Sequence, residues 1–213
     1  MPKSRGKKET QLRQQLAQEA ARLMAEQGIR DFFKAKTKAA QRLGITGREY
    51  LPSNAEIQAA LCTYQNLFQS QSQPQQLRRL RTVAREGMRF LQVFKPRLVG
   101  SVLLGTAGPH SDVNLHLFAD TAEQVALFLM EQGIPYQVNQ RQARYKNERT
   151  ETTTLYRFFA EEVAVELMVF PLLGLREAPK STLDGAPVRR MTLAELEALL
   201  ETEGPSANDM SEG

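Results

Sequence analysis

The chain has 213 residues, of which 41% are apolar, so it is long enough for one large domain or two small ones with a real core. The net charge is +4, and the single cysteine, Cys62, excludes an intramolecular disulfide and a cysteine-based zinc cluster. The apolar runs are far shorter than the roughly 20 residues of a membrane-spanning helix, and no signal-peptide core follows the basic N-terminus. We therefore expect a cytoplasmic protein without membrane contact.

The first third of the chain shows helical periodicity. Residues 1–8 are basic and are predicted to form a disordered tail, and three helices are expected over 9–27, 31–43 and from about 53 to 68. Gly28 and Gly44 suit the ends of the first two helices, and Ser53 or Asn54 suits the start of the third. Residues 9–68 therefore form a predicted N-terminal helical region.

A change of composition follows at residues 69–76, which are polar and lack periodicity. This segment is predicted to be a linker. A fourth helix, from about residue 77 to 91, carries an apolar stripe and several arginines. We expect its apolar stripe to pack against the sheet that follows.

Beyond Pro96 the pattern becomes strand-like. Strands are predicted over 97–104, 112–118, 136–144, 152–159 and 162–170, with a helix over 121–131 and a short final helix over 193–200. This order predicts an α+β protein, with an N-terminal helical region followed by a mixed sheet with flanking helices. The sheet domain is expected over 77–175, followed by an extension over 176–213 that ends in an acidic tail.

Polar residues interrupt the apolar pattern at two strands. Asp112, Asn114 and His116 alternate with apolar residues and so share one face of a strand. Glu166 lies within the apolar run 163–170, where an ionised side chain is costly unless it is paired or bound to a cation.

Two interpretations of these residues remain open. If the two strands are neighbours, Asp112, Asn114 and Glu166 converge on an oxygen-ligand site of the kind that Mg²⁺ prefers. Alternatively, Glu166 forms a salt bridge with Arg97 or Arg157. His116 either adds a nitrogen ligand or has a hydrogen-bonded structural role.

A longer motif surrounds these residues. It consists of Gly100-Ser101, Gly105, the run Ser111-Asp112-Val113-Asn114-Leu115 and the later Glu166. Over roughly residues 90–171 this motif resembles the signature of the nucleotidyltransferase fold of the DNA polymerase beta superfamily, especially its small bacterial members. Glycines at such a turn allow phosphate oxygens to approach backbone N–H groups.

The resemblance implies transfer of a nucleotide monophosphate from an NTP to an acceptor, with Mg²⁺ or Mn²⁺ as the metal. It implies nucleotide binding by Gly100, Ser101, Gly105 and Ser111, metal binding by Asp112, Asn114 and Glu166, and catalytic roles for Asp112 and Glu166. The sequence departs from the family at Asn114, where an amide replaces a carboxylate, and at Leu104, where small members often have arginine. A catalytically degenerate binding or regulatory module is therefore the alternative. Nucleic-acid binding through the basic helices is a third, less favoured hypothesis.

Overall fold

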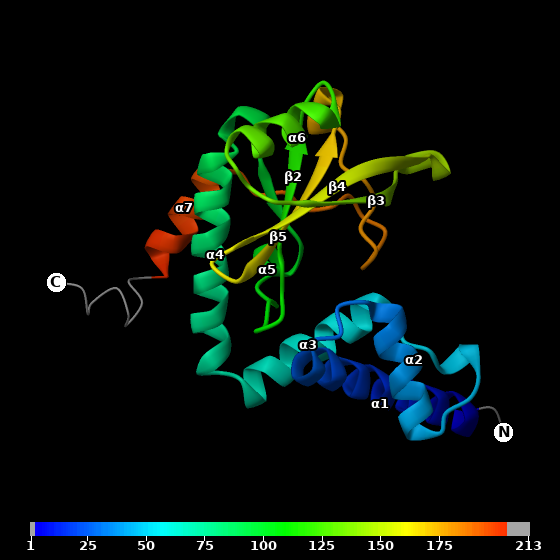
Figure 1. The fold of residues 1–213 in the computed structure, drawn as a ribbon. Helices are drawn as coiled ribbons and strands as arrows, with labels where there is room; N and C mark the ends of the chain where they lie inside the picture. The colour runs from blue at the N-terminus through cyan, green and yellow to red at the C-terminus, as the bar shows by residue number, and fades with distance from the viewer. Residues whose placement is uncertain (1–2, 204–213) are drawn as a thin grey trace. The chain divides into compact units, whose positions relative to one another are not determined.

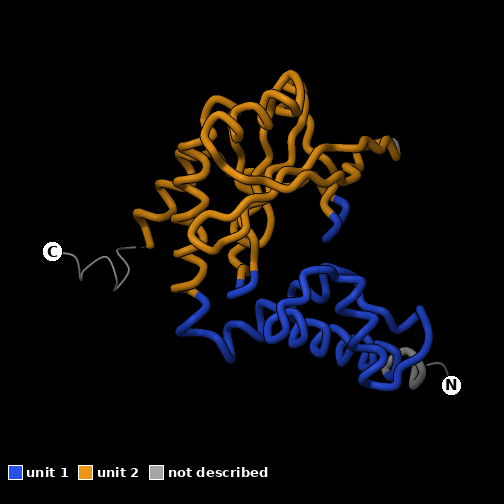
Figure 2. The backbone as a smooth tube through the Cα atoms, viewed as in Figure 1, with its two compact units in different colours: residues 1–73, 108–110, 182–185 blue, residues 74–107, 111–181, 186–213 orange. Residues whose placement is uncertain are grey.

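The computed structural model of the protein describes residues 3–203 and divides the chain into two compact units. Unit 1 comprises residues 1–73 with two short loops, 108–110 and 182–185, and unit 2 comprises residues 74–107, 111–181 and 186–213 (Figure 2). The division between Gln73 and Pro74 lies within the segment 69–76 that the sequence predicts as a linker. Within that segment, however, a helix already begins at Ser72.

Unit 1 contains the helices α1 (Lys3–Gln27), α2 (Phe32–Leu43), η1 (Arg48–Tyr50) and α3 (Asn54–Phe68). Asp31 caps α2 by accepting a hydrogen bond from the backbone N–H of Lys34 at 2.7 Å, and Gly44 ends α2 in the left-handed conformation. Ser53 and Glu56 form a capping box at the start of α3. Three of the fully buried side chains of its core are Leu16, Leu23 and Ile57.

The N-terminus differs from the sequence-based expectation. Residues 1–8 were expected to be a disordered tail, but α1 extends back to Lys3, while Met1 and Pro2 lie outside the described residues. Adding residues to an existing helix is much easier than nucleating one, and no proline interrupts residues 3–8. The basic composition alone therefore misplaced the start of this helix.

Unit 2 is built on a five-stranded mixed sheet with the order β1-β2-β5-β4-β3. Its strands are β1 (Arg97–Val99), β2 (Val113–Phe118), β3 (Gln137–Arg144), β4 (Thr150–Ala160) and β5 (Val163–Phe170). Its helices are α4 (Ser72–Phe90), η2 (Gln92–Phe94), α5 (Gly100–Leu104), α6 (Ala122–Glu131), η3 (Lys146–Glu148), η4 (Leu172–Leu175) and α7 (Leu193–Thr202). Only β2 and β5 pair in parallel; the other neighbours are antiparallel (Figure 1). The predicted α+β class is confirmed.

One predicted strand is wrong over most of its length. The strand expected over 97–104 ends at Val99, and Gly100 to Leu104 form the short helix α5. Gly100 has a φ of +76°, a conformation that favours glycine and turns the chain out of the strand. Val102 and Leu103 are buried in this helix, and such a short apolar run does not distinguish strand from helix.

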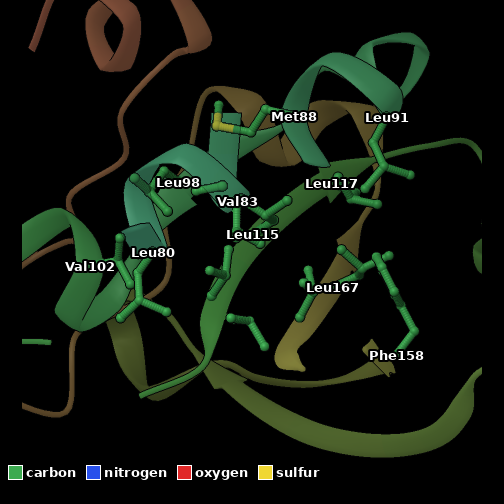
Figure 3. Close-up of a cluster of buried hydrophobic side chains, with 14 of the residues drawn as sticks. Leu80, Val83, Met88, Leu91, Leu98, Val102, Leu115, Leu117, Phe158 and Leu167 are labelled. Carbon is green, nitrogen blue, oxygen red and sulfur yellow. The ribbon is translucent and has the colours of Figure 1, made fainter. Parts of the chain in front are cut away.

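The two faces of the sheet differ in character. The face formed by residues such as Leu115, Leu117 and Leu167 packs against α4 and contributes to the main core (Figure 3). That core also contains Val125 of α6 and Leu196 of α7. Because side chains alternate along a strand, the intervening residues point to the opposite face, which carries the polar groups. Among the described residues, no helix is long and apolar enough to cross a membrane.

Candidate functional site

The three predicted metal ligands lie on the same face of the two central strands. Asn114 on β2 pairs directly with Glu166 on β5 in the parallel register. Asp112 precedes β2 by one residue and lies two positions from Asn114, so both side chains face the same way. Residues separated by about 50 positions in the sequence are thus brought together at the centre of the sheet.

The two carboxylates are buried and share an arginine. The Asp112 side chain is 6% exposed and that of Glu166 is 11% exposed. Arg157 on β4 places Nη2 3.7 Å from Asp112 Oδ2 and Nε 3.8 Å from Glu166 Oε1. Glu166 Oε2 also lies 3.1 Å from Nη2 of Arg141 on β3. The proposed ion pair between Glu166 and Arg157 is therefore present.

Arg97, the other arginine considered as a partner for Glu166, has a different role. Its Nη1 donates hydrogen bonds to the backbone oxygens of Lys95 at 3.2 Å and Pro96 at 2.9 Å. Arg141, in contrast, was not identified from the sequence. Its contact depends on β3, β4 and β5 being consecutive in the sheet, which no local pattern indicates.

The glycine-containing turn lies beside Asn114. A Cβ added at Gly100 would lie 3.4 Å from Asn114 Nδ2, at van der Waals contact, so the turn lies next to the amide and the positive φ favours glycine there. Gly105 ends α5 with a φ of +79° and donates its N–H to the Ser101 oxygen. Ser111 is half-buried directly before Asp112. The four predicted nucleotide-binding residues therefore all precede the predicted ligands in the chain, between the end of β1 and the start of β2.

The chemistry of the oxygen donors suits one hard cation. Asn114 Nδ2 donates to the backbone oxygen of Asp112 at 3.2 Å, which leaves Oδ1 as the amide atom available to a metal. Two carboxylates and one amide oxygen form a donor set that Mg²⁺ accepts, whereas an amide does not bridge two cations as a carboxylate does. Among residues 3–203, no group of three or more His, Cys, Asp or Glu side chains is arranged to hold a metal. One divalent cation fits this donor set, and a pair does not.

His116 continues the same face of β2 away from Asn114, in a hydrogen-bonded position. Arg190 Nε donates to His116 Nδ1 at 3.2 Å, and the imidazole packs against Phe170 with ring centroids 4.6 Å apart. Burial, together with the nearby Arg190 charge, lowers the pKa of His116 to about 3. A neutral histidine that accepts from Arg190 has the structural role that was one of the two sequence-based interpretations.

The arginine-rich helix α4 uses its charges within unit 2. Arg78 donates to the Leu200 oxygen at 3.0 Å, Arg81 pairs with Glu203, and Arg89 pairs with Glu197 at 2.7 Å. These contacts fasten α7 alongside α4 (Figure 1). The two remaining arginines contact Glu161 and Glu86. Each arginine of the cluster therefore has a partner in the fold.

Comparison of the sequence with models of known protein families, and with curated proteins, gives no match.

Proposed function

We propose that unit 2 binds a nucleoside triphosphate with one divalent cation and transfers a nucleotide monophosphate to an acceptor, as the resemblance to the nucleotidyltransferase fold implies. The observation that supports this proposal best is the register pairing of Asn114 with Glu166, with Asp112 two residues away on the same face. These three residues, which a sequence motif alone singled out, carry oxygen donors of the kind that Mg²⁺ or Mn²⁺ prefers.

In this proposal each group has a defined part. Asp112, Asn114 Oδ1 and Glu166 hold the cation, which when bound neutralises charge on the phosphates and polarises the reacting phosphoryl group. The turn at Gly100 and Ser101 orients the triphosphate through backbone N–H groups. Gly105 and Ser111 lie near the two ends of the loop that connects α5 to β2.

A binding or regulatory module without turnover is the second candidate. Two observations favour it: an amide stands at Asn114, and Arg157 lies close to both remaining carboxylates. Such a module would bind the nucleotide with its cation and change its stability or partner affinity without transfer.

Label transfer tests the proposal. Each of the four NTPs, labelled in the α-phosphate, is incubated with the protein, Mg²⁺ or Mn²⁺, and cell extract as the source of acceptor. We expect transfer that is lost in Asp112→Ala and retained in Asp120→Ala, which removes an exposed carboxylate beyond the other end of β2. Nucleotide binding without transfer from any NTP would select the binding module. Absence of both would reject the nucleotide site.

A further inference from the structure

Arg157 occupies an unusual position between the two buried carboxylates. Its distances of 3.7 Å to Asp112 and 3.8 Å to Glu166 exceed the roughly 3.2 Å limit of a good N–H···O hydrogen bond. Its Nε is buried and has no hydrogen-bond partner among the described residues. The guanidinium therefore compensates charge at both carboxylates without being locked to either by a short hydrogen bond.

A divalent cation at this place would compete with Arg157. Mg²⁺ draws its oxygen ligands to about 2.0–2.1 Å, and two positive groups that share the same pair of carboxylates repel each other. The Arg157 side chain is 28% exposed, and its Cζ lies 5.2 Å from the centroid of the Phe159 ring. The aromatic face of Phe159 is therefore at hand to support the guanidinium when it leaves the carboxylates.

We propose that Arg157 is a built-in cation that holds the Asp112–Glu166 pair until a divalent metal and a nucleotide arrive. The metal then takes the two carboxylates, and the displaced guanidinium pairs with the phosphates. This inference rests on the proposed function for the identity of the anionic ligand. It predicts that metal alone binds weakly, because it must displace Arg157, and that nucleotide strengthens metal binding.

Arg141 provides an internal comparison. Its ion pair in the described part of the chain is with Glu166 Oε2, and its side chain is 54% exposed, so its charge is well screened by water. Arg144, three residues further along β3, is exposed and points to the opposite face of the sheet. Arg157 and Arg141 thus differ in how strongly they act on the carboxylates, and Arg144 serves as a control on the opposite face.

Calorimetric titration with Mn²⁺ in the absence of nucleotide tests the competition. We expect Arg157→Gln to bind Mn²⁺ at least about ten-fold more tightly than wild type does. The Mn²⁺ affinity of Arg141→Gln should rise by at most about three-fold, and that of Arg144→Gln should not change. Arg157→Gln should have a lower thermal unfolding temperature than wild type, and Mn²⁺ should restore it, because the cation replaces the missing charge. Unchanged or weaker Mn²⁺ binding by folded Arg157→Gln would overturn the proposal.

A second variant keeps the test decisive if Arg157→Gln does not fold. In Arg157→Lys a single ammonium reaches one carboxylate at a time, so a gain in Mn²⁺ affinity of about three-fold is expected, and no gain contradicts the inference. The two proposals also fail separately. A gain in Mn²⁺ affinity without binding of any NTP would support the competition and reject the nucleotide. Mn²⁺-dependent NTP binding by wild type, without a gain in Mn²⁺ affinity in Arg157→Gln, would support the nucleotide site and reject the competition.

Discussion

Asn114 on β2 and Glu166 on β5 are register partners across a parallel strand pair, so a neutral amide lies beside a buried carboxylate. Neighbouring strands of a sheet lie only about 4.7–4.9 Å apart, so register partners on one face are adjacent. The charge at position 114 therefore acts directly on Glu166. An amide there keeps the site at two negative charges, and among the described residues Arg157 and Arg141 form ion pairs with them.

Replacement of Asn114 by aspartate should make folding dependent on a cation. We expect Asn114→Asp to lose about 1 kcal/mol or more of unfolding free energy in EDTA, because like charges face each other across the strands, and to regain it with Mn²⁺. Urea unfolding with and without metal measures both effects. Gln140→Glu, at an exposed position on the opposite face of β3 from Arg141, is the control and should respond to neither condition. A variant as stable as wild type in EDTA and insensitive to Mn²⁺ would show that position 114 is not part of a cation site.

The buried imidazole of His116 should make the protein less stable in mild acid. Its folded-state pKa of about 3 lies below the ordinary value of 6.5, so between these values the unfolded state binds the extra proton. Stability should therefore fall as the pH drops below about 6.5, by up to about 1.4 kcal/mol per pH unit from this group. Urea unfolding between pH 7.5 and 4.5 measures the slope.

The two histidines of the chain allow a matched comparison. His116→Gln keeps a hydrogen-bond acceptor for Arg190 but does not titrate, so this part of the pH dependence should disappear. His110→Gln removes the histidine of unit 1, and this variant should keep the same pH dependence as wild type. Equal slopes in wild type and His116→Gln would contradict a neutral His116.

The turn between β4 and β5 contains a strain that substitution should relieve. Glu161 and Glu162 connect the paired residues Ala160 and Val163, and both have positive φ, of 47° and 66°. Two-residue hairpins with this backbone prefer Asn-Gly, because at positive φ the Cβ atom of most L-residues lies too close to the following carbonyl oxygen. The double substitution Glu161→Asn with Glu162→Gly should raise the unfolding free energy by about 1 kcal/mol. Glu161→Gln with Glu162→Gln removes the charges but not the strain and should give no such gain.

Arg81 should contribute to stability more than its neighbours on α4. Its side chain is 8% exposed and contacts Glu203 and the Val102 oxygen, whereas Arg85 is 31% exposed and its described ion pair is with the adjacent Glu86. We expect Arg81→Met to lower the unfolding free energy by about 2 kcal/mol and Arg85→Gln to change it by less than about 0.5 kcal/mol. Equal effects in urea unfolding would show that Arg81 does not fasten the end of α7 to α4.

Local signals in the sequence identified much of the fold. Ser53 forms one of the two helix caps that the sequence offered, and Gly44 ends its helix as expected, because these effects depend on a few adjacent residues. The helix expected over 121–131 is present as α6, which begins at Ala122. The alternation of apolar and polar residues correctly separated the covered face of β2 from its polar face.

The side-chain contacts that the sequence did not predict depend on how distant segments are arranged in the fold. Arg141 reaches Glu166 across two strand pairs, and Arg190 reaches His116 from a segment without regular structure. Neither contact has a signature within a short window of sequence. The convergence of Asn114 with Glu166 was anticipated only on the condition that their strands are neighbours, which the motif suggested and the chain pattern alone did not.

The most direct test of the nucleotide site is the binding of an NTP with Mn²⁺, measured by calorimetry on wild type and Asp112→Asn. The substitution preserves size while removing one of the two anionic donors. We predict that wild type binds at least one of the four NTPs in a Mn²⁺-dependent manner, and that Asp112→Asn weakens this binding about ten-fold or more. Binding that is independent of Mn²⁺, equal in the two proteins, or absent for every NTP in wild type would contradict the account.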